Sequence, residues 1–145
     1  MARCEFCSII RGETPAEILF RNEHALSILD IRPIHYGHVL VLPIRHVETF
    51  IDVPEEEFAG LAAALRTVTR AVVEALHPPG FNVFSNNGHA AGQSVFHFHF
   101  HVTPRYPDDK IRFVLELKKY KHKEMSEYGR KIRNAMRPSA VPAQP

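Results

Sequence analysis

The stretch SVFHFHFHV, residues 94–102, decides the fold because from Phe96 to Val102 apolar side chains alternate with three histidines. Its histidines are His97, His99 and His101, and the residues between and after them are Phe98, Phe100 and Val102. Side chains two residues apart in a β-strand point to the same face. The stretch therefore predicts a strand over residues 94–103, with histidines on one face and an apolar core on the other.

The apolar face of this strand needs a partner, and residues 54–77 supply the clearest one. Apolar residues recur there at three- and four-residue spacing, which predicts a long amphipathic helix. Pro54 suits its first turn, and the acidic run at 55–57 favours the positive end of the helix dipole. The sequence Pro78-Pro79-Gly80 ends it.

Shorter elements surround these two. Strands are predicted at 18–20, 25–29, 39–42 and 81–84, a short turn or helix at 4–10, a weaker strand at 111–117 and a C-terminal helix at 124–137. Proline at 104 and 107 is expected to prevent much continuation of the strand that carries the histidines. Strands mixed with one long helix predict an α+β fold with an antiparallel sheet.

Length and composition indicate a globular protein. The chain has 145 residues, of which 45% are hydrophobic, and no run approaches the roughly 20 apolar residues that a membrane span needs. No apolar segment follows the N-terminus as in a secretory signal, and two cysteines are too few for a disulfide scaffold. We therefore expect a cytoplasmic protein that does not bind membranes, with a disordered tail at 138–145.

Charge is unevenly distributed. Between Lys110 and Arg137 there are ten basic and three acidic residues, a balance of +7, whereas the rest of the chain has −5. Such a segment could attract phosphates or nucleic acid. The favoured interpretation is a solvated helix face, so nucleic acid is not the expected partner.

Three histidines on one face suit phosphate chemistry. Imidazole has a reference pKa near 6.5, so about three quarters of such groups are neutral and nucleophilic at pH 7. A neutral histidine can attack phosphorus while its neighbours hold phosphate oxygens. Ser94 adds a hydroxyl, and Asn86 and Gln93 add neutral donors. The alternative is a stripe of surface histidines without a role, although exposed strands more naturally carry Thr, Lys or Glu.

Four stretches together resemble the histidine-triad (HIT) superfamily, whose signature is His-φ-His-φ-His-φ-φ with φ apolar. They are CEFCSIIRGETPAEILF (4–20), LDIRPIHYGHVLVLPIRH (29–46), FNVFSNNGHAAGQ (81–93) and GQSVFHFHFHVTPR (92–105). The last φ position is Thr103, a mild departure. The resemblance implies one HIT domain over 1–137, with its core at 4–106 and a basic extension at 107–137.

Membership implies nucleotide binding, with a purine as the expected base, and a homodimer whose two sheets join across the subunit interface. It also implies attack at the α-phosphorus by His99, which forms a nucleotidyl-histidine that water later cleaves. His101 would hold phosphate oxygens, His97 would orient the middle ring, and Ser94 would lie at the leaving group.

Further site residues carry over from the same motifs. Asp30 matches the residue that accepts hydrogen bonds from the ribose, and His38 matches a histidine beside the triad. Gln93 and Asn86 would border the phosphates. The apolar residues that would wall the base are Phe6, Ile9, Leu29 and Ile31. Taken alone, Asp30 before a turn could equally be a local turn former.

Cys4 and Cys7 form a CxxC motif. Thioredoxin-like chemistry expects this motif after a strand, and none precedes it here. Two thiolates with two histidines suit a structural zinc, and the resemblance implies His46 and His97 as the other ligands. The alternative is two buried free cysteines without a metal.

Two reactions remain open: hydrolysis of a nucleoside phosphoramidate, which the Gln93-Ser94 pair favours, and hydrolysis of a dinucleoside polyphosphate, which Pro104-Arg105 favours. A transfer of the nucleotide to an acceptor other than water also stays open. A regulatory or zinc-dependent interaction scaffold with little turnover is the non-enzyme alternative.

Overall fold

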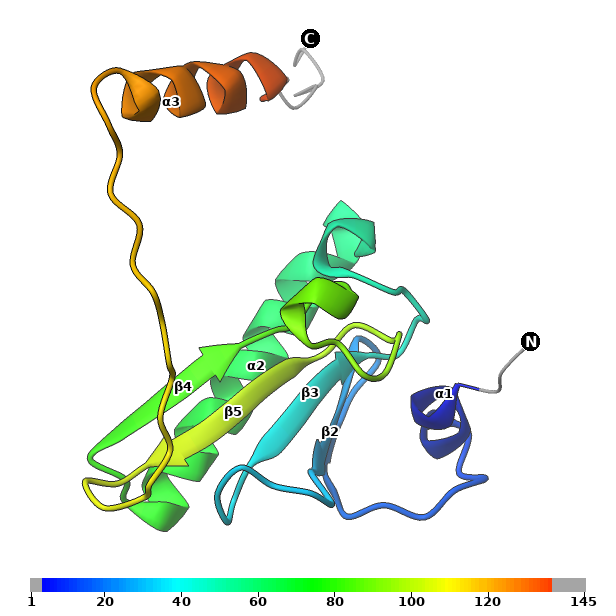
Figure 1. Ribbon diagram of the computed structural model, residues 1–145. Coiled ribbons are helices and arrows are strands. Elements are labelled where there is room, and N and C mark those ends of the chain that lie inside the picture. Colours follow the sequence, from blue (N-terminus) through cyan, green and yellow to red (C-terminus); the bar gives the residue numbers. More distant parts are fainter. Residues whose placement is uncertain (1–3, 137–145) are drawn as a thin grey trace, which may run out of the picture. The chain divides into compact units, whose positions relative to one another are not determined.

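The computed structural model describes residues 4–136, and its centre is a five-stranded sheet with strand order β1-β2-β3-β5-β4. The strands are β1 (Ile18–Arg21), β2 (Ala25–Leu29), β3 (Val39–Pro43), β4 (Gly80–Phe84) and β5 (Phe100–Arg105). All neighbouring pairs are antiparallel. The predicted α+β class is confirmed, and the strand with the last histidine lies inside the sheet between β3 and β4 (Figure 1).

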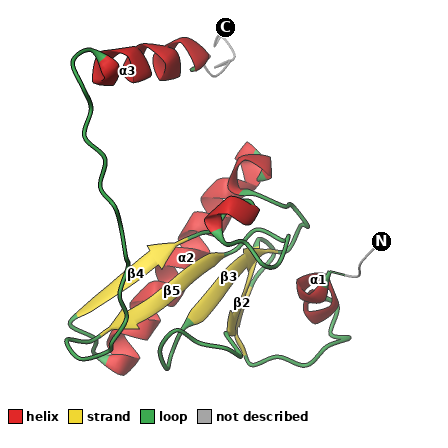
Figure 2. Ribbon diagram, viewed as in Figure 1, coloured by secondary structure: helices red, strands yellow, loops and turns green. Residues whose placement is uncertain are grey.

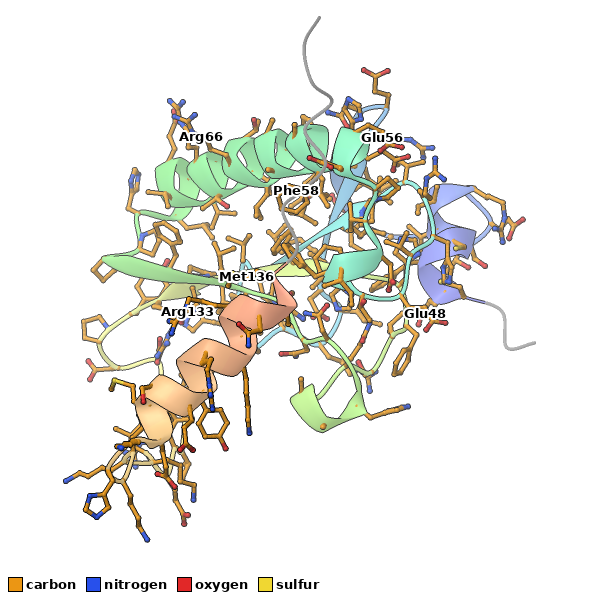
Figure 3. The ribbon with its side chains drawn as sticks, turned by 90° about the horizontal axis from the view of Figure 1, so that it is seen from above. Glu48, Glu56, Phe58, Arg66, Arg133 and Met136 are labelled. Atoms are coloured by element: carbon orange, nitrogen blue, oxygen red, sulfur yellow. The ribbon has the colours of Figure 1, made fainter. Side chains whose placement is uncertain are left out.

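Helix α2 (Glu55–Leu76) covers one face of this sheet, as Figure 2 shows. Figure 3 shows Phe58 on the side of α2 that faces the strands, whereas Arg66 lies on the outer side. The buried cluster between helix and sheet consists of Ala25, Val39, Val41, Leu61, Ala64, Val68, Val72, Phe98 and Val102. The apolar side of the histidine segment therefore packs against the long helix, as predicted.

Helix α1 (Glu5–Ile10) packs with the other side of the sheet. Its buried residues Phe6 and Ile9 join a second apolar cluster with Leu26, Ile28, Leu40 and Leu42. The helix begins at Cys4, whose sulfur accepts the backbone N–H of Cys7 at 3.4 Å. The face that carries the histidines is thus covered by a short helix with two cysteines in its first turn.

The predicted start of the histidine strand at Ser94 is wrong, since β5 begins at Phe100. Pairing between β3 and β5 stops at Val41 and Phe100. Beyond that point the N–H of Phe98 donates to the carbonyl of Val47 at 2.7 Å, so the chain follows a loop instead of a strand. His97 and His99 consequently lie in an irregular segment.

The C-terminal end of β5 lies two residues beyond the predicted one and before Pro107, so the strand does not continue far, as expected. The strand continues through Pro104 to Arg105, because β3 begins opposite Val102 and only β4 accompanies β5 further, an arrangement that tolerates a residue without an N–H. The strand predicted at 111–117 is wrong, since these residues have no regular secondary structure.

The chain divides into two compact units, with the boundary between Ile111 and Arg112. The second unit contains α3 (Glu124–Ala135), which confirms a helix in the predicted range. The single domain predicted over 1–137, with a core ending at 106, stays a prediction, and the tail at 138–145 lies outside the described residues. Among the helices in residues 4–136, none has the length and apolar character required to cross a bilayer.

Thr103, the residue that departs from the apolar signature, carries an energetic cost. Its side chain is 2% exposed and its hydroxyl has no hydrogen-bond partner among the described residues. Leaving a buried polar group unsatisfied costs roughly 1–3 kcal/mol. We predict that Thr103→Val raises the free energy of unfolding by about 1 kcal/mol in urea denaturation.

Thr69→Val is the matched control. The hydroxyl of Thr69 donates to the carbonyl of Leu65 at 2.7 Å, so its removal should bring no gain. A loss of stability in Thr103→Val would contradict the assignment of an unsatisfied hydroxyl.

Candidate active site and metal cluster

A cavity of about 420 Å³ lies against the histidine face. Its walls come from α1, the loop at 14–16, β2 and β3 with the loop after β2, and the segment that carries the histidines. His99 and His101 both line it, as does Ser94. Two imidazoles therefore meet a space large enough for a nucleotide-sized ligand.

His99 is held in one orientation by the backbone two residues before it. Its Nδ1 lies 2.7 Å from the carbonyl oxygen of His97, so Nδ1 carries the proton and donates it. This assignment leaves the lone pair on Nε2. Burial lowers the pKa of His99, although the hydrogen bond to His97 and the charge of Asp30 act in the opposite direction. The ring is therefore neutral at pH 7 and has its nucleophilic nitrogen free.

His101 receives its orientation from His38. The N–H of Ile34 donates to Nδ1 of His38 at 3.1 Å, which places the His38 proton on Nε2. That nitrogen lies 2.9 Å from Nδ1 of His101 and donates to it. The proton of neutral His101 must then be on Nε2.

The environment keeps His38 and His101 neutral, and it stacks the ring of His101 on an aromatic ring. Burial, with His99 and His38 as neighbours, lowers the pKa of His101 to about 4. Burial likewise lowers the pKa of His38. Phe84 of β4 stacks on His101 with ring centroids 4.6 Å apart and planes 10° apart. His101 is thus a fixed hydrogen-bond donor beside the neutral ring of His99.

The predicted ribose and base residues lie around the same cavity. Asp30, Phe6, Ile9, Leu29 and Ile31 all line it. One oxygen of Asp30 accepts the N–H of Arg32 at 2.8 Å, so the carboxylate also shapes its own turn, as the local interpretation expected. Its other oxygen lies 3.5 Å from Nδ1 of His38.

Asn86 and Gln93 do not line the cavity. The side-chain oxygen of Gln93 accepts the N–H of Gly88 at 2.7 Å, and its nitrogen donates to the carbonyl of Glu48 at 2.7 Å. The amide oxygen and nitrogen of Gln93 therefore connect two loops, and these are the groups that the sequence predicted beside a phosphate. Asn86 is half-buried, and its side chain lies near Gly92.

Several residues at the site were not foreseen. They are Thr14, Pro15, Ala16, Arg32 and Val95 in the cavity wall, Ile34 behind His38, and Phe84 on His101. The tertiary fold brings the loop at 14–16 to the cavity, and no local sequence pattern indicates this position. Phe84 could have been found from the register, since it is the partner of His101 in the antiparallel ladder.

The side chains of Cys4, Cys7, His46 and His97 converge beside the cavity, as the sequence predicts. One ligand atom from each lies within 4.8 Å of all the others. The distances to Nδ1 of His97 are 3.6 Å from either sulfur and 3.3 Å from Nδ1 of His46, and Cys7 Sγ lies 3.4 Å from Nδ1 of His46.

These separations fit a tetrahedral zinc. Bond lengths of about 2.3 Å to sulfur and about 2.0–2.1 Å to nitrogen separate sulfur from nitrogen by roughly 3.5 Å and the two nitrogens by roughly 3.3 Å. His97 also donates from Nε2 to the carbonyl of Pro43 at 2.9 Å, which leaves Nδ1 without a proton. Burial lowers the pKa of His97 to about 4, so the ring is neutral, as a metal ligand must be.

A second close group, Asp30, His38 and His101, is a poorer metal site. The facing nitrogens of His38 and His101 already share a hydrogen bond, so a metal would have to break it. The polar residues of the region thus divide into one metal-type cluster and one catalytic-type set.

The sequence profile of the HIT domain matches residues 11–108. The chain belongs to the HIT family. An uncharacterized HIT-like protein of Methanocaldococcus jannaschii is 43% identical over 106 residues, which cover 73% of this chain and 81% of the relative. The adenylylsulfatase HINT3 of Arabidopsis thaliana is 40% identical over 106 residues, 73% of this chain and 54% of its own length.

Solved structures of HIT proteins have the same fold. A HIT family member from Bacillus subtilis superimposes with a TM-score of 0.88 at 34% identity, covering 94% of this chain and 99% of its own. A zinc-bound histidine triad protein from Mycobacterium smegmatis has a TM-score of 0.70 at 42% identity and covers 91% of both chains. The HIT fold predicted from the sequence is therefore confirmed.

Proposed function

We propose that this HIT protein hydrolyses a nucleotide derivative at its α-phosphorus through a nucleotidyl intermediate on His99. The observation that supports it most strongly is the hydrogen bond from Nδ1 of His99 to the carbonyl of His97, which frees Nε2 at the cavity wall. A neutral, oriented imidazole is the nucleophile such a reaction needs.

The cavity lining suggests how the nucleotide is held. The base, a purine by preference, lies among Phe6, Ile9, Leu29 and Ile31, and the ribose hydroxyls donate to Asp30. The α-phosphate then reaches the histidines, where Nε2–H of His101 donates to a non-bridging oxygen. Preorganised donors of this kind stabilise charge that develops in the transition state.

The reaction has two steps. Nε2 of His99 forms a bond to the α-phosphorus as the bond to the leaving group breaks, and Ser94 lies at the side from which that group departs. Water then attacks the same phosphorus and gives up one proton, the P–N bond breaks, and a nucleoside monophosphate leaves with His99 neutral again. The proton from water replaces the one that the leaving group took up as it departed. The backbone carbonyl of His97 stabilises the imidazolium character of His99 in both steps.

The leaving group can be an amine, a sulfate or a second nucleotide. The similarity to an adenylylsulfatase adds sulfate to the two classes expected from the sequence. Arg105, expected to favour a longer polyphosphate, instead donates to Asp109 at 2.6 Å and to Asn82 at 2.6 Å. This engagement favours the short substrates, and rates on adenosine phosphoramidate, adenylyl sulfate and diadenosine tri- and tetraphosphate would rank the classes.

A homodimer is the expected assembly. Strand β4 is an edge of the sheet, and its apolar residues Phe81 and Val83 are 48% and 40% exposed. Pairing of β4 with its copy would cover this edge and extend the sheet across the subunits.

His99→Ala tests the nucleophile. We predict that it abolishes both hydrolysis and the trapping of a labelled adenylyl-protein, because His101, the other described histidine that lines the cavity, has a proton on its Nε2. Binding of AMP, measured by calorimetry, should change by less than tenfold, since the base and ribose contacts stay.

Two results would decide against this mechanism. Turnover retained in His99→Ala would remove the nucleophile assignment. Binding of AMP by the unaltered protein without any adenylyl intermediate or turnover on the substrates above would favour the scaffold alternative.

We also propose that the Cys4–Cys7–His46–His97 cluster binds one structural zinc. Its donor set and separations support this, and so does the resemblance to a zinc-bound relative. Two thiolates and two neutral imidazoles form a closed shell without a position for water, so the metal would stabilise α1 and not take part in catalysis. The cytoplasm, predicted from the sequence, would keep both cysteines reduced.

Metal analysis of the purified protein should give one zinc per chain. Cys7→Ser should lose it, because a serine hydroxyl does not replace a thiolate, whereas Ser8→Ala, in the same helix turn, should keep it. Zinc that remains stoichiometric in Cys7→Ser would contradict this ligand set.

A further inference from the structure

The nucleotide cavity and the metal-type cluster share helix α1. The sulfur atoms of Cys4 and Cys7 belong to the cluster, whereas Phe6 and Ile9 from the same helix line the cavity. Phe6 contacts both groups of histidines, with its ring 5.9 Å from the ring of His97 and 5.1 Å from that of His99. A change in how the cysteines are held should therefore reach the substrate wall.

Besides the contacts within this cluster, few polar contacts attach α1 to the rest of the fold. Among those in the described residues, Arg21 donates to the carbonyl of Ile10 at 2.9 Å, at the far end of the helix. At its beginning, the ligand atoms of Cys4 and Cys7 face His46 and His97, which come from distant parts of the chain. The first turn of α1 is thus held both by the apolar burial of Phe6 and, through its two sulfur atoms, by the cluster.

The cluster can also be reached from solvent. Cys4 and Cys7 are half-buried and His46 is exposed, so a small oxidant can approach the thiols. The two sulfur atoms lie within 4.8 Å of each other. Residues three apart in a helical turn have Cα atoms about 5–5.5 Å apart, inside the range that a disulfide accepts. These are the only two cysteines in the sequence.

We propose that Cys4 and Cys7 form an oxidant-sensitive latch on the nucleotide cavity. As thiolates they hold the first turn of α1 against His46 and His97 through the metal, and as a Cys4–Cys7 disulfide they release it. The inference rests on the proposed nucleotide site and on metal binding by the cluster, and it adds a control that neither requires.

The chemistry uses a peroxide as the oxidant. The Cys7 thiolate attacks one oxygen of hydrogen peroxide, takes up that OH as a sulfenic acid, and the second oxygen leaves as water after gaining a proton. The Cys4 thiolate then attacks the Cys7 sulfur, forming the S–S bond, and the sulfenic hydroxyl leaves as a second water with another proton. Two thiolates lose two electrons in all, peroxide is reduced to water, and the metal loses both of its sulfur ligands.

Release of the first turn should weaken substrate binding. His46 and His97 alone are two ligands of a four-ligand site and cannot retain zinc well. Phe6 would then lose its fixed position between the base and the rings of His97 and His99. Reduction with a dithiol, followed by zinc, should restore the original state because no atom of the chain is lost.

The test uses the full-length, zinc-loaded protein before and after one equivalent of hydrogen peroxide. We expect release of one zinc per chain to a chromogenic chelator, a mass loss of about 2 Da for a disulfide, and faster amide hydrogen exchange in residues 4–10. The dissociation constant for AMP should rise at least tenfold, and dithiothreitol with zinc should reverse all four changes.

Cys4→Ser/Cys7→Ser is the matched control, because it keeps every methionine that peroxide could oxidise. In this variant the exchange of residues 4–10 should already be fast, and peroxide should change neither exchange nor AMP affinity. The latch is overturned if the disulfide forms while the exchange of residues 4–10 stays slow, or if oxidation stops at sulfinic acid. If the reduced protein fails to bind AMP at all, the proposed nucleotide function is wrong, and the exchange measurement still decides the latch.

Discussion

The site depends on how His97 is held by three groups at once. Its Nε2 donates a hydrogen bond to the carbonyl of Pro43, and its Nδ1 faces the sulfur atoms of Cys4 and Cys7 and the ring of His46. Its backbone carbonyl accepts a hydrogen bond from Nδ1–H of His99. The side chain belongs to the metal-type cluster, whereas the main-chain carbonyl orients His99, the proposed nucleophile. One buried residue can therefore fulfil two requirements that would conflict if both used the imidazole nitrogens.

Burial gives the histidines their chemical character. Removing imidazole from water disfavours its charged form, and the positive charge that a neighbouring ring would carry adds to this effect. The pKa values of His97 and His101 fall to about 4, and those of His38 and His99 are also lowered, mainly through burial. Neutral rings have defined tautomers, and the backbone groups of Ile34 and His97 select them. The hydrogen bonds of the protein alone thus leave Nε2 of His99 with a lone pair and Nε2 of His101 with a proton, as the proposed mechanism requires.

The sequence predicted the faces of the histidine segment better than its secondary structure. Two-residue alternation correctly placed Phe98 and Val102 against α2, because burial selects the apolar side whether or not a ladder forms. It could not reveal that Phe98 bonds to Val47, a contact over fifty residues, so the strand was predicted six residues too early. Gln93 shows the same limit. The sequence predicted that its side-chain amide borders the phosphates, but in the fold this amide forms hydrogen bonds that connect two loops. Residue types and motif order predicted which four residues form the Cys/His cluster, whereas the cavity wall at 14–16 required the tertiary structure.

The central claim is that Nε2 of His99 faces the α-phosphorus of a bound nucleotide. A crystal structure of the protein with AMP measures this directly. The account predicts the phosphorus about 3–3.5 Å from Nε2, with Nδ1 still bonded to the carbonyl of His97 and the ribose at Asp30. A phosphate seated away from His99, or a ring turned so that Nε2 faces the carbonyl of His97, would contradict it.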